Sequence, residues 1–262
     1  MVESVQKGPR RPKPVDPHEV TLAGEVQKLL LPKNSPLCSW CCMSARIRMA
    51  DVLGGDFYDF IELEDGSQVI LIGDVTGHGL HASVVMSLMY GFIHHAARQS
   101  CKPDAVVADL NTFLRSFAKR SDLLDHYFSA TLFFGFIDPH TLTMHYVNAG
   151  HPAGLVHRGD EVLRLPATSH PVGYFDRADF QVGTFQFATD DRFLLYTDGL
   201  VDCTNQHGEM FGAERLVDAF RRLNGDHMVF LDKLFAEMNT FLAGQPPFDD
   251  CTAIVMDFHG TI

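Results

Sequence analysis

The sequence predicts an α+β protein in which two mainly antiparallel sheets pack together and are flanked by helices. Most segments of strand character are separated by hairpin-length turns, which connect antiparallel neighbours. Two amphipathic helical segments follow one another at 81–99 and 103–119, and two more lie near 213–222 and 228–243, so the helices should form layers of their own. A chain of 262 residues, 46% of them hydrophobic, can bury a substantial core around such sheets.

Three segments follow one another along the chain. Residues 1–14 are rich in Pro, Lys and Arg, which predicts a disordered basic arm. A helix is expected within 15–32, because Asp16 can cap it, Pro17 suits its first position, and its apolar side chains share one face. No linker composition appears later, so 33–262 should form a single domain.

The strands are predicted in two groups. The first group contains 43–49, 57–63 and 68–74, and an Asp65-Gly66 turn joins its last two members. The second group contains 128–138, 142–149, 154–158, 161–166, 181–187 and 192–197. A final strand at 252–258 follows the last two helices. The first pair of helices therefore separates the two groups of strands.

Charge and composition exclude several classes of partner. The formal charge of −12 opposes general binding to nucleic acid or to anionic lipid. No stretch reaches the roughly 18 uncharged apolar residues that span a bilayer, and the start lacks the apolar core of a signal peptide. The six cysteines are irregularly spaced, and the Cys38 and Cys41 pair has no second pair at zinc spacing. We expect a cytoplasmic protein with reduced thiols.

Aspartates stand where several predicted elements begin or end. They are Asp56, Asp74, Asp198 and the Asp249-Asp250 pair. Carboxylates gathered at one sheet edge raise one another's pKa and destabilise a fold unless cations neutralise them. An all-oxygen cluster suits Mg²⁺ or Mn²⁺ better than zinc. Spacing alone does not bring these aspartates together, because a single aspartate at a strand end is commonly a turn former or a helix cap.

Five segments carry a family resemblance, and they occur in the family's order. They are LGGDFYDF at 53–60, GDVTGHGLHASVVMSLM at 73–89, NAGHPAG at 148–154, YTDGLVD at 196–202 and DDCTAIVM at 249–256. Together they resemble the PPM family of metal-dependent protein phosphatases, in its SpoIIE/RsbU-type bacterial branch. The resemblance covers about residues 17–258. It implies a four-layer α-β-β-α sandwich and a protein serine/threonine phosphatase, which is a phosphoric monoester hydrolase.

The resemblance also implies a metal centre of two Mn²⁺ or Mg²⁺ ions, with a third ion left open. Asp74 would bridge the two metals, while Asp198 and Asp249 would hold one of them. The Val75 carbonyl would help to hold the other metal, and Asp56 would bind directly or through a metal-bound water. Asp56 and Asp74 would thereby serve catalysis, in which a metal-activated water displaces the phosphate without a covalent intermediate.

Some neighbouring residues keep two interpretations at this stage. Asp250 is an alternative to Asp249 as the ligand. His78 is expected to order a loop or to face solvent, and no general-acid role transfers to it. Arg46 and Arg48 lie on the strand that leads to Asp56, where they could meet a phosphate or carry an exposed charge.

The resemblance implies a phosphorylated regulatory protein as the substrate, of the STAS-domain type found in partner-switching and sigma factor regulation. The helix within 15–32 resembles a segment that links a sensor domain to the phosphatase and takes part in homodimerisation. A separate sensor or activator protein is therefore also expected. Two other functions stay open, a pseudophosphatase that binds a phosphorylated regulator without turnover and a hydrolase of small phosphoesters.

Overall fold

A computed structural model describes residues 16–36, 38–100 and 102–260 and arranges their strands in two five-stranded sheets. The order is β1-β10-β9-β6-β7 in the first sheet and β2-β3-β4-β5-β8 in the second. Neighbouring strands in both sheets pair antiparallel. The predicted class, two antiparallel sheets flanked by helices, is confirmed. The predicted arm at 1–14 lies outside the described residues.

The first sheet contains β1 (Cys41–Arg48), β6 (Gly154–Arg158), β7 (Glu161–Leu165), β9 (Arg192–Tyr196) and β10 (Cys251–Phe258). The second contains β2 (Asp56–Glu62), β3 (Gln68–Val75), β4 (Ala130–Asp138), β5 (Thr143–Ala149) and β8 (Gly183–Gln186). The helices are α1 (Pro17–Leu30), α2 (Leu80–Ala97), α3 (Pro103–Ala118), the short α4 (Gly199–Asp202), α5 (Gly212–Arg222) and α6 (His227–Leu242). A 3-10 turn, η1 (Asp125–Phe128), precedes β4.

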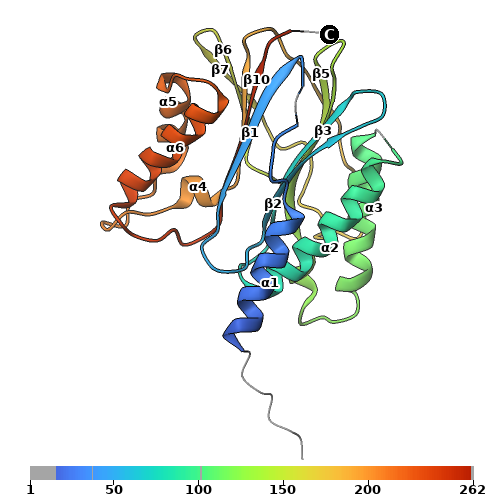
Figure 1. Cartoon of the computed structure of the whole chain (residues 1–262). Helices are drawn as coiled ribbons and strands as arrows, with labels where there is room; N and C mark the ends of the chain where they lie inside the picture. The colour runs from blue at the N-terminus through green and yellow to red at the C-terminus, as the bar shows by residue number, and fades with distance from the viewer. Residues whose placement is uncertain (1–15, 37, 101, 261–262) are drawn as a thin grey trace, which may run out of the picture.

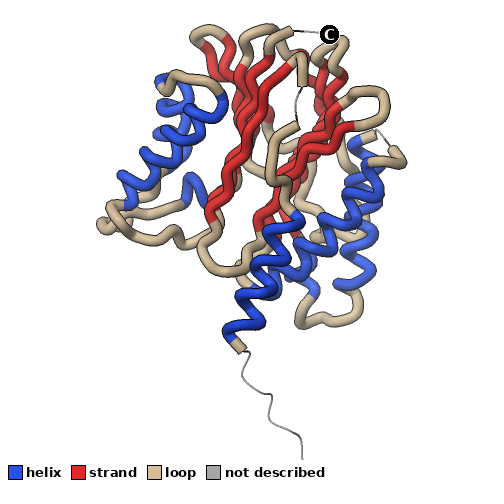
Figure 2. Tube along the Cα trace, viewed as in Figure 1, coloured by secondary structure: helices blue, strands red, loops and turns tan. Residues whose placement is uncertain are grey.

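The helices form an outer layer on each side of the paired sheets. Figure 1 shows α5 and α6 beside β1 and β10, and α2 and α3 on the opposite side beside β3. The same layers are visible in Figure 2, where the red strands stand between two blocks of blue helices. Helix α1 packs on α2. The molecule is therefore the expected four-layer sandwich, with α1 added at one end.

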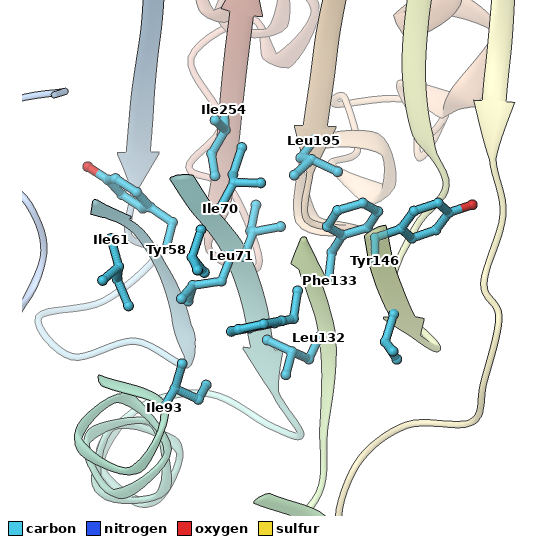
Figure 3. Close-up of a cluster of buried hydrophobic side chains, with 14 of the residues drawn as sticks. Tyr58, Ile61, Ile70, Leu71, Ile93, Leu132, Phe133, Tyr146, Leu195 and Ile254 are labelled. Atoms are coloured by element: carbon cyan, nitrogen blue, oxygen red, sulfur yellow. The ribbon is translucent and has the colours of Figure 1, made fainter. Parts of the chain in front are cut away.

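Large apolar side chains fill the space between the sheets. Figure 3 shows Ile254 and Leu195 of the first sheet facing the second sheet, which contributes Ile70 and Phe133. The ring of Phe133 lies 5.9 Å from that of Phe193, which belongs to the first sheet. A second buried cluster lies under α5 and α6. Because apolar burial is the main force that holds these layers together, the polar site has to form at the end of the sandwich.

Antiparallel topology brings four chain segments to that end. In the second sheet β2 begins where β3 ends, and Asp56 is the direct partner of Asp74. In the first sheet β9 ends where β10 begins, and the Thr197 amide donates to the Thr252 carbonyl at 3.0 Å. The packing of the two sheets then places both pairs of strand ends at one rim of the sandwich.

Candidate metal centre

Asp56 lies at this rim with its carboxylate between the two sheets. Its side chain is only 1% exposed, and both Thr197 and Thr252 donate their hydroxyls to Oδ2, at 2.8 and 2.5 Å. Among the described residues no donor reaches Oδ1. Burial, followed by the nearby Asp74 carboxylate, raises the pKa of Asp56 well above its ordinary range, and the two hydroxyls offset part of this rise.

Asp74 is the second carboxylate of the rim and stands directly opposite Asp56 in the β2–β3 pair. Burial raises its pKa to about 8, and the carboxylates of Asp198 and Asp249 contribute next. These two charges come from the other sheet, so side chains far apart in sequence repel one another here. The Val75 carbonyl belongs to the same rim, because a Cβ placed on Gly55 would lie 3.0 Å from its oxygen.

Asp198 follows β9 and reaches the rim because Gly199 lets the chains approach closely. A Cβ on Gly199 would lie 2.1 Å from the Asp250 carbonyl oxygen and 3.3 Å from the Asp249 Cβ. Partial loss of hydration raises the pKa of Asp198, and the charges of Asp202 and Asp249 add to the rise, although the side chain keeps an exposed surface.

Asp249 and Asp250 are neighbours in sequence with different surroundings. The buried Asp250 carboxylate accepts the backbone N–H groups of Ala50 and Gly55, at 2.8 and 2.9 Å, and so holds the loop before β2. A Cβ on Gly54 would lie 2.0 Å from its Oδ2, so this contact requires glycine there. Asp249 is half-buried, and among the described residues its Oδ1 accepts only the Asp250 N–H. Asp249 is therefore the member of the pair that is available to a ligand.

In the described part of the chain, no basic side chain compensates the negative charge at the rim. Within the described residues, no ion pair joins a basic side chain to Asp56, Asp74, Asp198 or Asp249. A carboxyl whose pKa rises on folding opposes the folded state when it is ionised, so this rim reduces stability at neutral pH. Oxygen ligands short of positive charge are the donor set that Mg²⁺ and Mn²⁺ prefer.

The carboxylates converge without closing around a common point. In the part of the chain that the structure describes, no three His, Cys, Asp or Glu side chains form a ready-made metal-binding group. The residues at the rim nevertheless fit hard divalent cations in the type of donor and in charge. Ligation would then draw neighbouring carboxylates together against their mutual repulsion.

The two arginines of β1, Arg46 and Arg48, have their partners on α6. Arg46 pairs with Asp232 and lies 5.5 Å from the ring of Phe235, and Arg48 bonds to Asn239. Both arginines therefore face α6, and the interpretation in which they meet a phosphate is not supported.

His78 is exposed and packs edge-on against Phe248, with ring centroids 6.2 Å apart, as expected of a residue that orders a loop.

Sequence reasoning missed three side chains that hold the rim in place. Thr197 directly precedes Asp198 in YTDG, Thr252 lies two residues after Asp250 in DDCT, and this proximity was the available signal. The third is Gln27, a buried polar residue on α1 that bonds to both the carbonyl and the amide of Gly54, at 2.7 and 3.1 Å. A glutamine within an apolar helical pattern gave no indication of a partner 27 residues away.

Comparisons with known proteins agree with this architecture. The model of the family described as Stage II sporulation protein E (SpoIIE) matches residues 64–259. Protein IcfG of Synechocystis sp. is 26% identical over 260 residues, which cover 91% of this chain and 41% of that protein. Phosphoserine phosphatase RsbP of Bacillus subtilis is 33% identical over 154 residues, 58% of this chain and 38% of that protein. The chain thus spans about 40% of the length of these curated relatives.

Solved structures share the fold. The SiaA-PP2C domain of Pseudomonas aeruginosa superposes with a TM-score of 0.79 at 22% identity, covering 92% of this chain and 96% of that domain. The catalytic domain of the serine/threonine phosphatase PstP, solved in complex with two manganese ions, gives a TM-score of 0.63 at 16% identity and covers 84% of this chain and 99% of that domain. In the present chain, no helix of the described segments has the length and apolar character needed to cross a bilayer.

The two adjacent aspartates should respond differently to truncation. We expect Asp250→Ala to lower the free energy of unfolding by about 2–5 kcal/mol, because the buried N–H of Gly55 and the part-buried N–H of Ala50 lose their acceptor. Asp249→Ala should change it by less than about 1 kcal/mol, since Asp249 holds no other segment. Urea unfolding of both variants measures the difference. An equal loss in the two would contradict the assignment of Asp250 as the residue that holds the loop.

Proposed function

Because the chain belongs to the SpoIIE family of PPM-type phosphatases, we propose that it is a metal-dependent protein serine/threonine phosphatase. The observation that carries the proposal is the uncompensated convergence of carboxylates from both sheets at one rim. The proposed metal residues are Asp56, Asp74, Val75, Asp198 and Asp249. Two divalent ions, Mn²⁺ or Mg²⁺, would supply an activated water and neutralise charge on the phosphoryl oxygens.

Each residue has its own part in this proposal. Asp74, between charges from both sheets, is the proposed bridging ligand, and Asp198 and Asp249 would complete one metal position. Asp56 is fixed through Oδ2 by its two threonines, so Oδ1 is the atom left to orient a metal or a water. The Val75 carbonyl would serve the second position. The manganese complex of the PstP domain supports the choice of ion.

The proposed substrate is a phosphoserine or phosphothreonine on a bacterial signalling protein, of the STAS type used in partner switching. Two relatives from Bacillus subtilis, RsbP and RsbU, are both named phosphoserine phosphatases, and this supports the residue class. The residues 33–262 would form the phosphatase domain. Assays on a serine-phosphorylated STAS protein and on 4-nitrophenyl phosphate separate a protein phosphatase from a hydrolase of small phosphoesters.

Replacing the proposed bridging ligand should separate function from stability. We expect Asp74→Asn to lower Mn²⁺-dependent phosphate release by at least about a hundredfold, because an amide is a far weaker metal ligand. Without metal the variant should unfold at the same temperature as the wild type or a higher one, because the wild type has to bury or protonate a carboxylate at this position and the variant does not. EDTA should abolish wild-type turnover, and Asp122→Asn on an exposed loop is the control.

Phosphate release that persists in Asp74→Asn, or in EDTA, would contradict the metal centre. Wild-type protein that binds the phosphorylated regulator but never releases phosphate would instead indicate a pseudophosphatase.

We also propose that α1 regulates the centre through Gln27. The Gln27 side chain is 3% exposed and makes two hydrogen bonds to the backbone of Gly54, which lies two residues before Asp56. Movement of α1 would therefore shift the loop that Asp250 also holds. This coupling gives the predicted regulatory helix within 15–32 a route to the metal ligands, and an activator protein could act on it.

Loss of the glutamine contact should weaken the metal centre. Gln27→Ala removes two hydrogen bonds to a buried backbone segment, so we expect the apparent affinity for Mn²⁺ to fall about tenfold. Lys28→Ala, on the exposed side of the same helix, is the matched control. Mn²⁺ titration of 4-nitrophenyl phosphate hydrolysis gives both values. Equal affinities in the wild type and Gln27→Ala would argue against the coupling.

The outer face of α1 is the proposed homodimer contact. Leu22 and Val26 are 58% and 54% exposed, and they line an apolar cavity of about 660 Å³ together with Leu80 and Val84 of α2. Contiguous exposed apolar surface of this kind typically marks an interaction site.

A charge on this face should prevent dimerisation. We expect a dimer for the wild type and a monomer for Leu22→Asp, because the carboxylate would lose its hydration in the interface. Glu25→Lys, which changes an exposed charge on the same helix, should stay dimeric. Light scattering with size-exclusion chromatography measures the mass, and a wild type that is monomeric at every concentration tested would refute the homodimer.

A further inference from the structure

A groove of about 700 Å³ lies beside the carboxylate rim and contains none of the proposed metal ligands. Three chain segments, 50–51, 204–208 and 245–248, line it together with His78. A volume of this size falls within the roughly 300–1,000 Å³ of pockets that bury a small organic ligand, so it exceeds the needs of one phosphate group.

The groove adjoins the rim at several points. Phe248 directly precedes Asp249, and the Ala50 amide donates to the Asp250 carboxylate at 2.8 Å. His78 lies three residues beyond Val75 and packs against Phe248, with ring centroids 6.2 Å apart. A molecule with its phosphate at the carboxylates would therefore extend along this groove.

Both walls of the groove are held by local structure. One wall is a short hairpin closed by the Thr204–Met210 bridge, and inside it the Asn205 side chain accepts the N–H groups of His207 and Glu209, at 2.9 and 3.1 Å. The other wall contains Pro246 and Pro247, whose φ angles are fixed by their rings. Walls that are already ordered lose little entropy when a ligand binds.

The lining suits an extended peptide. Gln206 and Gln245 carry side-chain amides that can hydrogen-bond to a peptide backbone. Phe248 is 82% exposed, which leaves a large apolar ring on a surface that gains from covering it. Among the described residues, the lining contains no Lys or Arg, so the groove offers no permanent positive charge and leaves the phosphate to the rim.

We propose that this groove binds the peptide segment next to the phosphorylated residue of the protein substrate, with Phe248 as its apolar contact. The inference rests on the proposed phosphatase function and adds a determinant of substrate choice. Phe248 would favour substrates that carry an apolar side chain beside the phosphoserine, and it would raise kcat/KM for such proteins relative to small phosphoesters.

A competition assay tests this directly. An equimolar library of phosphoserine nonapeptides, randomised on both sides of the phosphoserine, is incubated with Mn²⁺-loaded enzyme, and the dephosphorylated products are read by mass spectrometry. The same enzyme is assayed on 4-nitrophenyl phosphate. The enzymes are the wild type, Phe248→Ala, and Tyr174→Ala as the control, because Tyr174 is also exposed, at 61%, and is not part of the groove lining.

We expect the wild type to select apolar residues on one side of the phosphoserine. In Phe248→Ala this selection should disappear, and the ratio of peptide to 4-nitrophenyl phosphate kcat/KM should fall about tenfold, the effect typical of a lost aromatic contact. Tyr174→Ala should match the wild type in both respects.

Four results would overturn the inference. Turnover by the wild type without selection, or selection that survives in Phe248→Ala, would remove the groove from substrate recognition while leaving the phosphatase intact. Dimerisation that Phe248→Ala abolishes would assign the groove to a second copy of the chain. Absence of metal-dependent turnover of every substrate would remove both this inference and the function on which it rests.

Discussion

Repulsion among carboxylates is the constraint on which the functional end of this molecule depends. Asp56, Asp74, Asp198 and Asp249 come from two sheets and meet where the apolar core ends. Burial and mutual charge raise the pKa of Asp74 to about 8, so its ionised form opposes folding at neutral pH. The rest of the sandwich has to supply the stability that this arrangement removes. A bound cation would turn the same repulsion into ligation.

Supporting contacts hold the carboxylates in this unfavourable position. Two threonine hydroxyls fix Asp56 across the sheets, and Asp250 binds the loop in front of it. Gly54 and Gly199 permit the close approach, since a side chain at either position would overlap Asp250. Helix α1 adds Gln27 to the same loop. Helix α1 is therefore linked to the buried Asp56 through Gln27 and Gly54, so a protein that bound to α1 and moved it could shift the carboxylate.

Sequence patterns predicted the architecture well because the signals were local. Turn residues, strand alternation and helical spacing fixed the element types, and the short α4 was missed because four residues carry too little periodicity. The convergence of the aspartates could not be predicted from spacing and came only from family resemblance. Asp249 and Asp250 could not be told apart, since the difference lies in backbone partners 195 and 200 residues away. Arg46 and Arg48 turned to α6 because acidic and amide partners were available there.

The central claim is that the carboxylate rim binds two divalent metal ions. Equilibrium dialysis against Mn²⁺ tests it without reference to any substrate, by comparing the wild type with Asp249→Ala. The account predicts about two bound ions per chain in the wild type and a clear loss of bound metal in the variant, although the variant remains folded. Equal and negligible binding of Mn²⁺ by both proteins would contradict it.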